Sequence, residues 1–226
     1  NSFKNWQTFY KEFFKNDFPK WPAEPLIRIL NGKYLKYRIK KKTNVKILDV
    51  GCGTGNNLIL FNNKKNKLYG TEVTTKTAKL TQDYLKSINV EAEILKGTNL
   101  KLPFKNNFFD ILISVNTIHY EKTNKDILRS LREYNRVLKK NGKVIIFTVG
   151  PSHDIFKKAK LYGKNQYEVQ NWDFRNGEKY FYFESEKYLK FYSSKFFKNI
   201  ETGRVRENLM KINLDFLILT GNKWKS

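Results

Sequence analysis

Short apolar runs alternate along this chain with segments whose apolar residues recur every three or four positions. The first pattern indicates buried strands, and the second indicates amphipathic helices. The apolar runs predict strands at residues 45–50, 67–72, 91–96, 109–115 and 143–149. The periodic segments predict helices at residues 54–61, 74–87 and 124–138. Strands that alternate with helices in this way favour an α/β fold around a parallel sheet.

The N-terminal end of the chain departs from this alternation. An aromatic segment at residues 5–14 predicts one helix, and residues 24–39 predict a second helix with Pro25 in its first turn. We interpret residues 1–42 as a helical lid. The alternative for its aromatic side chains is ordinary packing of two helices against the sheet.

The main domain is predicted to span residues 43–226. After the fifth strand, a segment rich in tyrosine, tryptophan and phenylalanine predicts a cap at about residues 151–183. The tail predicts a final helix and two final strands, at residues 185–192, 196–202 and 214–220.

A glycine-rich turn follows the first predicted strand, in the sequence Asp49-Val50-Gly51-Cys52-Gly53-Thr54-Gly55. The dinucleotide fingerprint needs the spacing G-x-G-x-x-G, but position 56 is asparagine, so that fingerprint fails. A carboxylate two residues before the turn would repel a diphosphate, whereas it would attract an ammonium or sulfonium group. The turn therefore favours a cofactor that carries positive charge.

This segment resembles the first motif of the class I S-adenosylmethionine-dependent methyltransferases, a hydrophobic pair followed by D-x-G-x-G-x-G. The resemblance continues in order over about residues 43–149. Residues 67–72 look like the second strand of the family, which ends on an acid that accepts hydrogen bonds from the ribose hydroxyls. Lys96-Gly97-Thr98-Asn99-Leu100-Lys101-Leu102-Pro103-Phe104 resembles the family's G-D-A-x-x-L-P-F segment beside the adenine, with threonine where many members have aspartate. Residues 108–116 and 131–143 resemble the fourth strand and the L-x-E-x-x-R-V-L-K-P-G-G stretch.

The resemblance implies an α/β, Rossmann-like fold: seven mostly parallel strands, an antiparallel last strand and helices on both faces. It also implies S-adenosyl-L-methionine as the cofactor. Tyr10 of the lid is a candidate partner for the methionine carboxylate. The predicted cofactor-binding residues are Tyr10, Asp49, Gly51, Cys52, Gly53, Gly55, Glu72, Val73, Thr98, Asn99, Leu100 and Asn116.

Methyl transfer from a sulfonium requires chiefly alignment, but a hydroxyl acceptor also benefits from a general base. His119 follows the fourth predicted strand, where the transferable methyl group should face the acceptor. His153 follows the fifth strand and is the second candidate. The alternative for both is a structural histidine.

The formal net charge of +23 raises the question of nucleic acid as a partner. Of the 44 basic residues, 36 are lysine and 8 are arginine, although arginine is the better phosphate ligand. Lysine clusters at residues 40–42, 64–67 and 139–143 precede strands, whereas ligands of such sheets bind at the carboxyl ends. We therefore interpret most of this charge as solvated surface and keep nucleic acid as a competing partner.

The remaining composition narrows the class of protein. A single cysteine, Cys52, excludes an internal disulfide, and two histidines give no basis for a metal site. No apolar run approaches the ~18 residues of a membrane span, and we expect a cytoplasmic protein. The favoured function is O-methylation of a small polar or sugar-linked metabolite, with a bacterial surface-saccharide precursor as one option. The alternatives are a tRNA or other nucleic-acid methyltransferase and a catalytically silent binding protein. The acceptor and the oligomeric state stay open.

Overall fold

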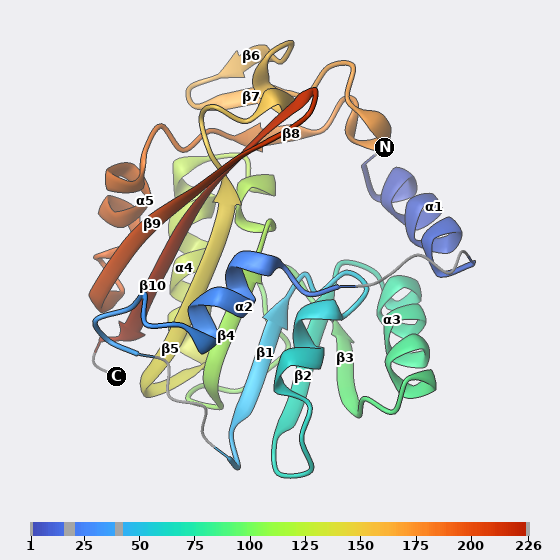
Figure 1. Ribbon diagram of the computed structural model, residues 1–226, viewed down its shortest axis with the longest axis vertical. Coiled ribbons are helices and arrows are strands. Elements are labelled where there is room, and N and C mark those ends of the chain that lie inside the picture. The colour runs from blue at the N-terminus through green and yellow to red at the C-terminus, as the bar shows by residue number, and fades with distance from the viewer. Residues whose placement is uncertain (1, 16–20, 39–42, 225–226) are drawn as a thin grey trace.

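A twisted sheet of seven strands forms the centre of the molecule (Figure 1). The computed structural model describes residues 2–15, 21–38 and 43–224. The strand order is β3-β2-β1-β4-β5-β10-β9, in which β1 to β5 are parallel and β10 runs antiparallel to both of its neighbours. The predicted sheet is therefore confirmed. Its strands are β1 Lys46–Val50, β2 Lys67–Glu72, β3 Ala92–Lys96, β4 Phe109–Val115, β5 Leu138–Val149, β9 Phe197–Leu209 and β10 Ile212–Lys223.

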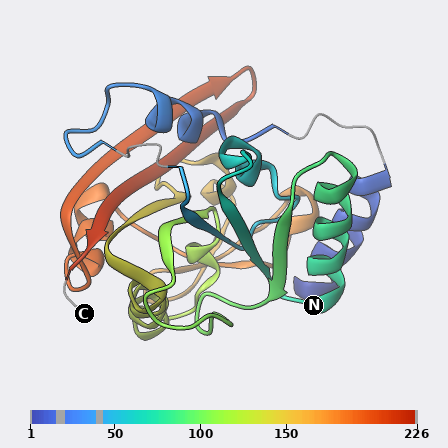
Figure 2. The ribbon, with the colours of Figure 1, turned by 90° about the horizontal axis from the view of Figure 1, so that it is seen from below.

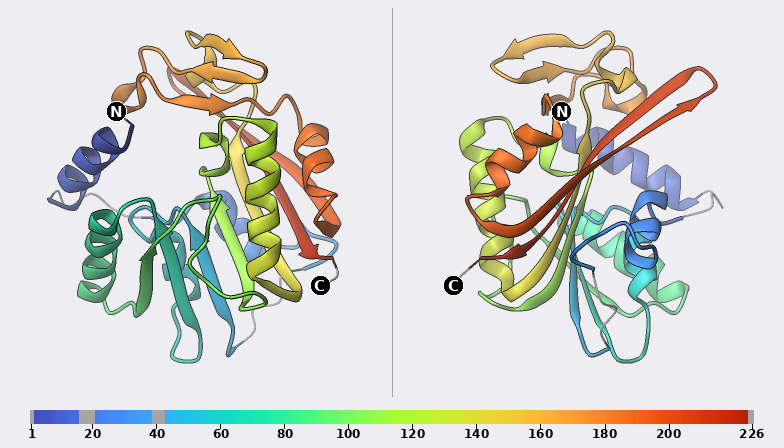
Figure 3. Two further views of the ribbon diagram at one scale, coloured as in Figure 1. Left: turned by 180° about the vertical axis from the view of Figure 1, so that it is seen from behind. Right: turned by 60° about the vertical axis from the view of Figure 1, so that its left-hand side comes forward.

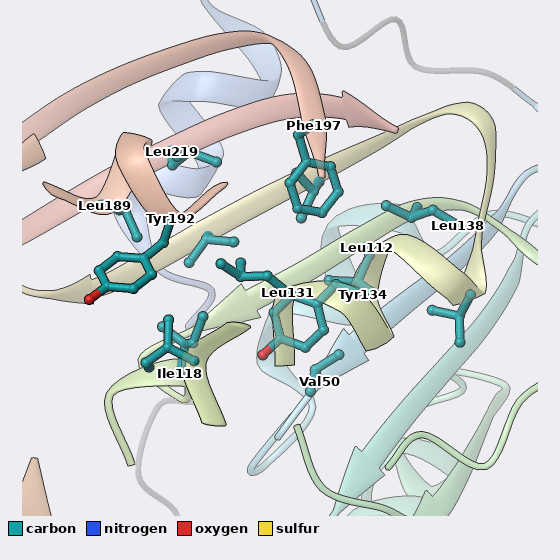
Figure 4. Packing of buried hydrophobic residues seen from close by; sticks show 14 of the residues in the cluster. Val50, Leu112, Ile118, Leu131, Tyr134, Leu138, Leu189, Tyr192, Phe197 and Leu219 are labelled. Atoms are coloured by element: carbon teal, nitrogen blue, oxygen red, sulfur yellow. The ribbon is translucent and has the colours of Figure 1, made fainter. Parts of the chain in front are cut away.

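Both faces of this sheet are covered by helices (Figure 2). Successive side chains of a strand point to opposite faces, so Leu48 packs with α4 and α5 while Ile47 packs with α2, η1 and α3. The α4 side contains the fully buried Leu131 and Tyr134 (Figure 4). The helices are α1 Ser2–Lys15, α2 Glu24–Asn31, α3 Thr75–Ser87, α4 Asn124–Val137 and α5 Glu186–Ser193, with short 3₁₀ helices η1 Asn56–Phe61, η2 Ile118–Tyr120, η3 Asp154–Phe156 and η4 Asp173–Arg175.

Three helices begin at residues whose hydroxyl oxygen accepts a backbone N–H of the first turn. Thr74, Thr123 and Ser185 cap α3, α4 and α5 in this way. A cap of this kind satisfies one of the orphan N–H groups at a helix start, which is why these boundaries can be read from the sequence.

A second, three-stranded antiparallel sheet lies over the carboxyl edge of the main sheet (Figure 3). It is built from β6 Lys160–Gly163, β7 Gln166–Glu168 and β8 Lys179–Phe181. A small buried cluster of Val149, Ile155, Val169 and Tyr180 joins it to the end of β5. These strands fall within residues 151–183, the predicted cap, although the domain boundaries themselves stay a prediction.

The lid helix α1 packs against α3 and against η4 of the cap (Figure 1). It thereby lies at the carboxyl edge of the sheet. Among the described residues, no helix combines the length and the apolar character that crossing a membrane requires. The lysines at residues 40–42 lie outside the described part of the chain.

Some elements differ in extent or type from the sequence prediction. The helix predicted for residues 24–39 ends at Asn31, because the backbone becomes extended at the C-cap Gly32, with φ −88° and ψ −176°. Further along, the N–H groups of Lys36 and Tyr37 donate to the carboxylate of Glu201, at 2.8 and 2.9 Å. The segment predicted as a helix at residues 54–61 is a 3₁₀ helix over its last six residues. Strands β5, β9 and β10 are longer than predicted, and the last two form one long hairpin.

A buried ion pair ties this hairpin to the start of the cap. Asp215 of β10 is 1% exposed and accepts both Nε and Nη2 of Arg204, each at 2.6 Å. The N–H of Ser152 donates to the same carboxylate at 2.7 Å. Removing one partner from such a pair leaves the other charge desolvated and unpaired.

We expect Asp215→Ala to lower the free energy of unfolding by about 3 kcal/mol, because Arg204 would lose both of its short hydrogen bonds to Asp215 and keep only the 4.0 Å contact with Glu186 as an ion pair among the described residues. Urea denaturation followed by circular dichroism measures this change. The matched control is Glu24→Ala, which removes the exposed pair with Arg28 and should cost less than about 1 kcal/mol. Equal effects of the two substitutions would contradict the structural importance of the buried pair.

Candidate functional site at the carboxyl edge of the sheet

The sheet order reverses between β1 and β4, which is where ligands bind in open α/β sheets. The chain continues from β1 toward β2 on one side, whereas β4 lies on the other side. Three predicted site residues meet at this edge: Asp49 near the end of β1, Glu72 at the end of β2 and Asn116 just after β4. The topology therefore brings together residues that are far apart in the sequence.

The glycine turn after β1 has no side chains of its own at three positions, and Thr117 and Tyr10 pack close to its backbone. Gly51, Gly53 and Gly55 have φ angles of 64°, 58° and 79°, a region that favours glycine. A Cβ on Gly51 would lie 2.5 Å from Cγ2 of Thr117, and a Cβ on Gly53 would lie 3.1 Å from the hydroxyl oxygen of Tyr10. Both positions therefore require a residue without a side chain.

Glu72 is buried at 4% exposure beside this turn. Burial raises the pKa of its carboxyl group to about 7, although N–H groups of Gly53 and Val73 and the Thr77 hydroxyl act in the opposite direction. The Gly53 N–H lies 2.6 Å from Oε1 of Glu72. The carboxyl group is therefore poised near neutral pH, where a donor from a ligand would favour its ionised form.

Asp49 is still more deeply buried, at 1% exposure. Burial, together with the nearby charge of Glu72, raises the pKa of Asp49 well above its usual value. Its Oδ2 is 3.5 Å from Nδ2 of Asn57, and its Oδ1 is buried without a hydrogen-bond partner. An unsatisfied buried acceptor is costly, so a donor from a ligand would be stabilising here.

Asn116 presents a second unsatisfied acceptor at the end of the neighbouring strand. Its backbone has a positive φ of 57°, and its N–H donates to the carbonyl of Phe147 at 3.0 Å. Its side-chain Oδ1 is buried without a partner. Two adjacent strand ends thus each hold an acceptor that an ammonium group could satisfy. This set of acceptors, two carboxyl groups and an amide oxygen, fits the amino, ribose and sulfonium groups of S-adenosylmethionine.

The predicted adenine segment contributes differently. The side-chain amide of Asn99 donates to the carbonyl of Thr117 at 3.1 Å and to Oε1 of Glu121 at 2.9 Å, and its Oδ1 accepts the hydroxyl of Tyr134. These contacts hold the loop after β3 against the loop after β4. Thr98 is exposed, and its backbone pairs with Lys101.

The remaining predicted cofactor residues are apolar or neutral. Val73 and Leu100 are half-buried. The single thiol, Cys52, is buried, and burial and the nearby acids raise its pKa well above the usual value, so it is a neutral group. The cofactor-binding roles of all these residues stay predictions.

His119 lies beyond the carboxyl end of β4, in η2. Its ring is buried, and Nδ1 is 3.2 Å from Oγ1 of Thr148. Burial, followed by the charges of Arg175 and His153, lowers the pKa of His119 to about 3. The imidazole is therefore neutral at physiological pH, the form that can accept a proton.

His153 has a local structural contact. Its Nδ1 accepts the N–H of Ile155 at 3.0 Å and so caps η3. Its ring packs against Trp172 and Phe216. Burial lowers its pKa to about 4. These contacts account for the position of His153 without a catalytic role. The catalytic role of His153 stays a prediction.

An aromatic cluster, here called the cap cluster, links the lid to His119. Trp6 of α1 lies 5.5 Å from Tyr10, 4.7 Å from Phe174 and 5.9 Å from Tyr120, between ring centroids. Tyr120 and Tyr180 share a hydrogen bond of 2.9 Å, and the Tyr180 ring is 4.4 Å from His119. Sequence reasoning did not single out Tyr120 or Tyr180, although Tyr120 directly follows His119. The cap cluster consists of Trp6, Phe9, Tyr120, Phe174, Arg175 and Tyr180.

Comparison with known proteins identifies the family. Residues 48–146 match the family model of a methyltransferase domain. An uncharacterised protein of Methanocaldococcus jannaschii is 32% identical over 65% of this chain and 49% of its own length. A sterol 4-C-methyltransferase of Caenorhabditis elegans is 24% identical over 72% of this chain and 50% of its own length.

The chain thus spans about half the length of these two curated relatives. The fold is also that of a solved S-adenosylmethionine-dependent methyltransferase from Methanosarcina mazei, with a TM-score of 0.71, 18% identity and coverage of 91% of this chain and 100% of the other. S-adenosylmethionine is the cofactor of the proteins that share this domain. From the domain match, the sheet order and the residues at its carboxyl edge, we conclude that residues 48–146 of this chain form a methyltransferase domain with the fold of the S-adenosylmethionine-dependent class.

Proposed function

We propose that this chain transfers a methyl group from S-adenosylmethionine to a hydroxyl oxygen of a small polar, sugar-linked metabolite. The observation that carries the proposal is the pair of unsatisfied buried acceptors, Oδ1 of Asp49 and Oδ1 of Asn116, at the ends of two adjacent strands. Asp49 and Asn116 lie where the strand order reverses, between β1 and β4, at the edge of the sheet that also holds the buried carboxyl group of Glu72.

In this proposal the chain's own residues hold and orient the reactants. Asp49 and Asn116 accept hydrogen bonds from the cofactor's amino group, and Glu72 accepts them from the ribose hydroxyls. The bare backbone of the glycine turn permits close approach, and Tyr10 closes over it. When bound, the cofactor supplies an activated methyl group on a sulfonium. Two buried carboxyl groups favour that positive charge.

We assign to His119 the role of taking the acceptor's proton, which its place just after β4 and its neutral imidazole support. In the tautomer whose Nδ1 donates to Thr148, the lone pair of Nε2 is free for a hydroxyl proton. Nε2 of His119 would take the proton of the acceptor's hydroxyl and pass it to water, while the bound cofactor would supply the methyl group. The low pKa makes His119 a weak base. A weak base is sufficient here, because the hydroxyl group becomes more acidic as methyl transfer proceeds.

A small acceptor is preferred over nucleic acid because of what the described lysines contact. Lys139 donates to the carboxylate of Asp110 at 2.8 Å, and Lys143 donates to the carbonyl of Tyr37 and to Asn222. Both lie at the amino-terminal end of the parallel strands, away from the site. The charges of Lys139 and Lys143 are therefore engaged in contacts within the fold.

We expect Asp49→Asn and Glu72→Gln each to weaken S-adenosylmethionine binding about tenfold to a hundredfold. Each substitution removes hydrogen bonds to a charged acceptor worth ~1.5–3 kcal/mol. Calorimetric titration measures the affinity. Asp83→Asn, on the exposed face of α3, is the control and should bind like the wild type. Wild-type affinity in both site variants would show that Asp49 and Glu72 do not bind the cofactor.

We expect cofactor affinity to rise more than tenfold between pH 5.5 and pH 7. The pKa of Glu72 is about 7 in the free protein, so its ionised, hydrogen-accepting fraction grows steeply over this range. Titrations at several pH values measure the slope. In Glu72→Gln the slope should flatten, and an unchanged slope would rule out Glu72 as the titrating group.

We expect His119→Ala to reduce turnover of a hydroxylated acceptor about a hundredfold while cofactor affinity stays unchanged, because the proton acceptor is lost but the cofactor residues are not. Release of S-adenosylhomocysteine measures turnover. Thr148→Val, which removes only the hydrogen bond to Nδ1, is the comparison and should give a smaller loss. Full activity in His119→Ala would remove the histidine from the mechanism.

A further inference from the structure

Arg175, at the end of η4, places a positive charge in the aromatic cap cluster. Its guanidinium carbon lies 4.4 Å from the centroid of the Phe174 ring and 5.7 Å from that of Trp6. Its side chain is 30% exposed, and it forms an ion pair with Asp173. Asp173 is itself 46% exposed and belongs to the same short turn, so the pair does not fix Arg175 to another element.

The cap cluster places this charge between the lid and His119. Trp6, which contacts Arg175, also contacts Tyr120, and Tyr120 is hydrogen-bonded to Tyr180, which packs on His119. On the other side, Trp6 packs on Tyr10, whose hydroxyl covers Gly53 of the cofactor turn. Arg175 is close enough for its charge to act on His119, Tyr10 and Tyr120. It therefore lies on the side of the site that the acceptor must occupy.

The charges of the site are divided between these two sides. The cofactor side holds the buried acids Asp49 and Glu72. The acceptor side holds the cation Arg175, together with its partner Asp173 and the buried Glu178, whose charge acts on Tyr120 and Tyr180. A cationic acceptor would be repelled by the guanidinium, and a neutral one would gain little from it. A carboxylate or phosphate would gain two parallel charged hydrogen bonds from the guanidinium fork.

We propose that Arg175 selects the acceptor by an anionic group, so that the methylated molecule is a small hydroxylated carboxylate or phosphate ester. This inference rests on the proposed function and narrows its substrate class. The guanidinium holds the anionic group, the rings of Trp6 and Phe174 contact the adjoining apolar surface, and a hydroxyl of the same molecule is presented toward His119. Neutralising Arg175 in this way also removes one of the charges that lowers the pKa of His119.

The experiment measures anion binding to the full chain with saturating S-adenosylhomocysteine present. The probes are benzoate and inorganic phosphate, with benzamide as the neutral match of benzoate, all at one ionic strength. The side-chain indole NMR signal of Trp6, assigned with Trp6→Phe, reports binding beside Arg175. The variants are Arg175→Gln, Arg175→Lys and, as a control on the exposed surface of the cap, Lys164→Gln.

At least one of the two anions should shift the Trp6 signal in the wild type, and benzamide should not. Arg175→Gln should weaken anion binding at least tenfold, Arg175→Lys should restore part of it, and Lys164→Gln should behave like the wild type. Which anion binds distinguishes a carboxylate from a phosphate. No shift with either anion, an equal shift with benzamide, or equal binding by Arg175→Gln would overturn the proposal. A shift produced only by a short single-stranded RNA would also overturn it, in favour of a nucleic-acid acceptor.

Calorimetric titration with S-adenosylmethionine runs in parallel on the same variants. Normal cofactor affinity together with absent anion binding would leave the methyltransferase proposal standing and remove only the role of Arg175. Absent cofactor binding in the wild type would remove the proposed function itself. The two failures are therefore distinguishable.

Discussion

Two carboxyl groups are buried side by side at the carboxyl edge of the sheet, and the arrangement around them reduces the cost of that burial. Glu72 accepts a backbone N–H from Gly53, while one oxygen of Asp49 has only a long contact with Asn57 and the other has no partner. Carboxyl groups without water or a counter-ion favour their protonated form, so the free protein holds this pocket at some cost. A ligand that brings positive charge and donors relieves the cost, which explains why so polar a site can persist inside the sheet.

Helix α1 contacts both the cofactor side and the acceptor side of the proposed site. The lid helix α1 places Tyr10 over the glycine turn and Trp6 against η4 and Tyr120. Because the two side chains are one helical turn apart, closure over the cofactor and closure over the acceptor cannot be independent. If α1 contacted only the cofactor side or only the acceptor side, the other side would be open to water.

Much of the fold could be predicted from the sequence because its strands are buried on both faces and read as continuous apolar runs. The prediction failed where a distant residue decides the local structure. Beyond Gly32, which ends α2, Glu201 accepts the N–H groups of Lys36 and Tyr37 across more than 160 positions, and no local pattern indicates this contact. Within the candidate site, the glycine turn and Glu72 could be predicted, because their spacing along the sequence indicates them. The contacts of Arg175 with Trp6 could not, since they depend on how the lid and the cap meet.

The long β9–β10 hairpin gives the cap a second attachment besides its covalent connection. Asp215 binds the N–H of Ser152, and Asp154 of η3 accepts the N–H of Asn213 at 3.0 Å. The segment that covers the acceptor side is therefore supported by the last two strands, which come after it in the sequence. In evolutionary terms the cap is not an interchangeable module: exchange of residues 151–183 between relatives would preserve its shape only if the terminal hairpin were inherited with it.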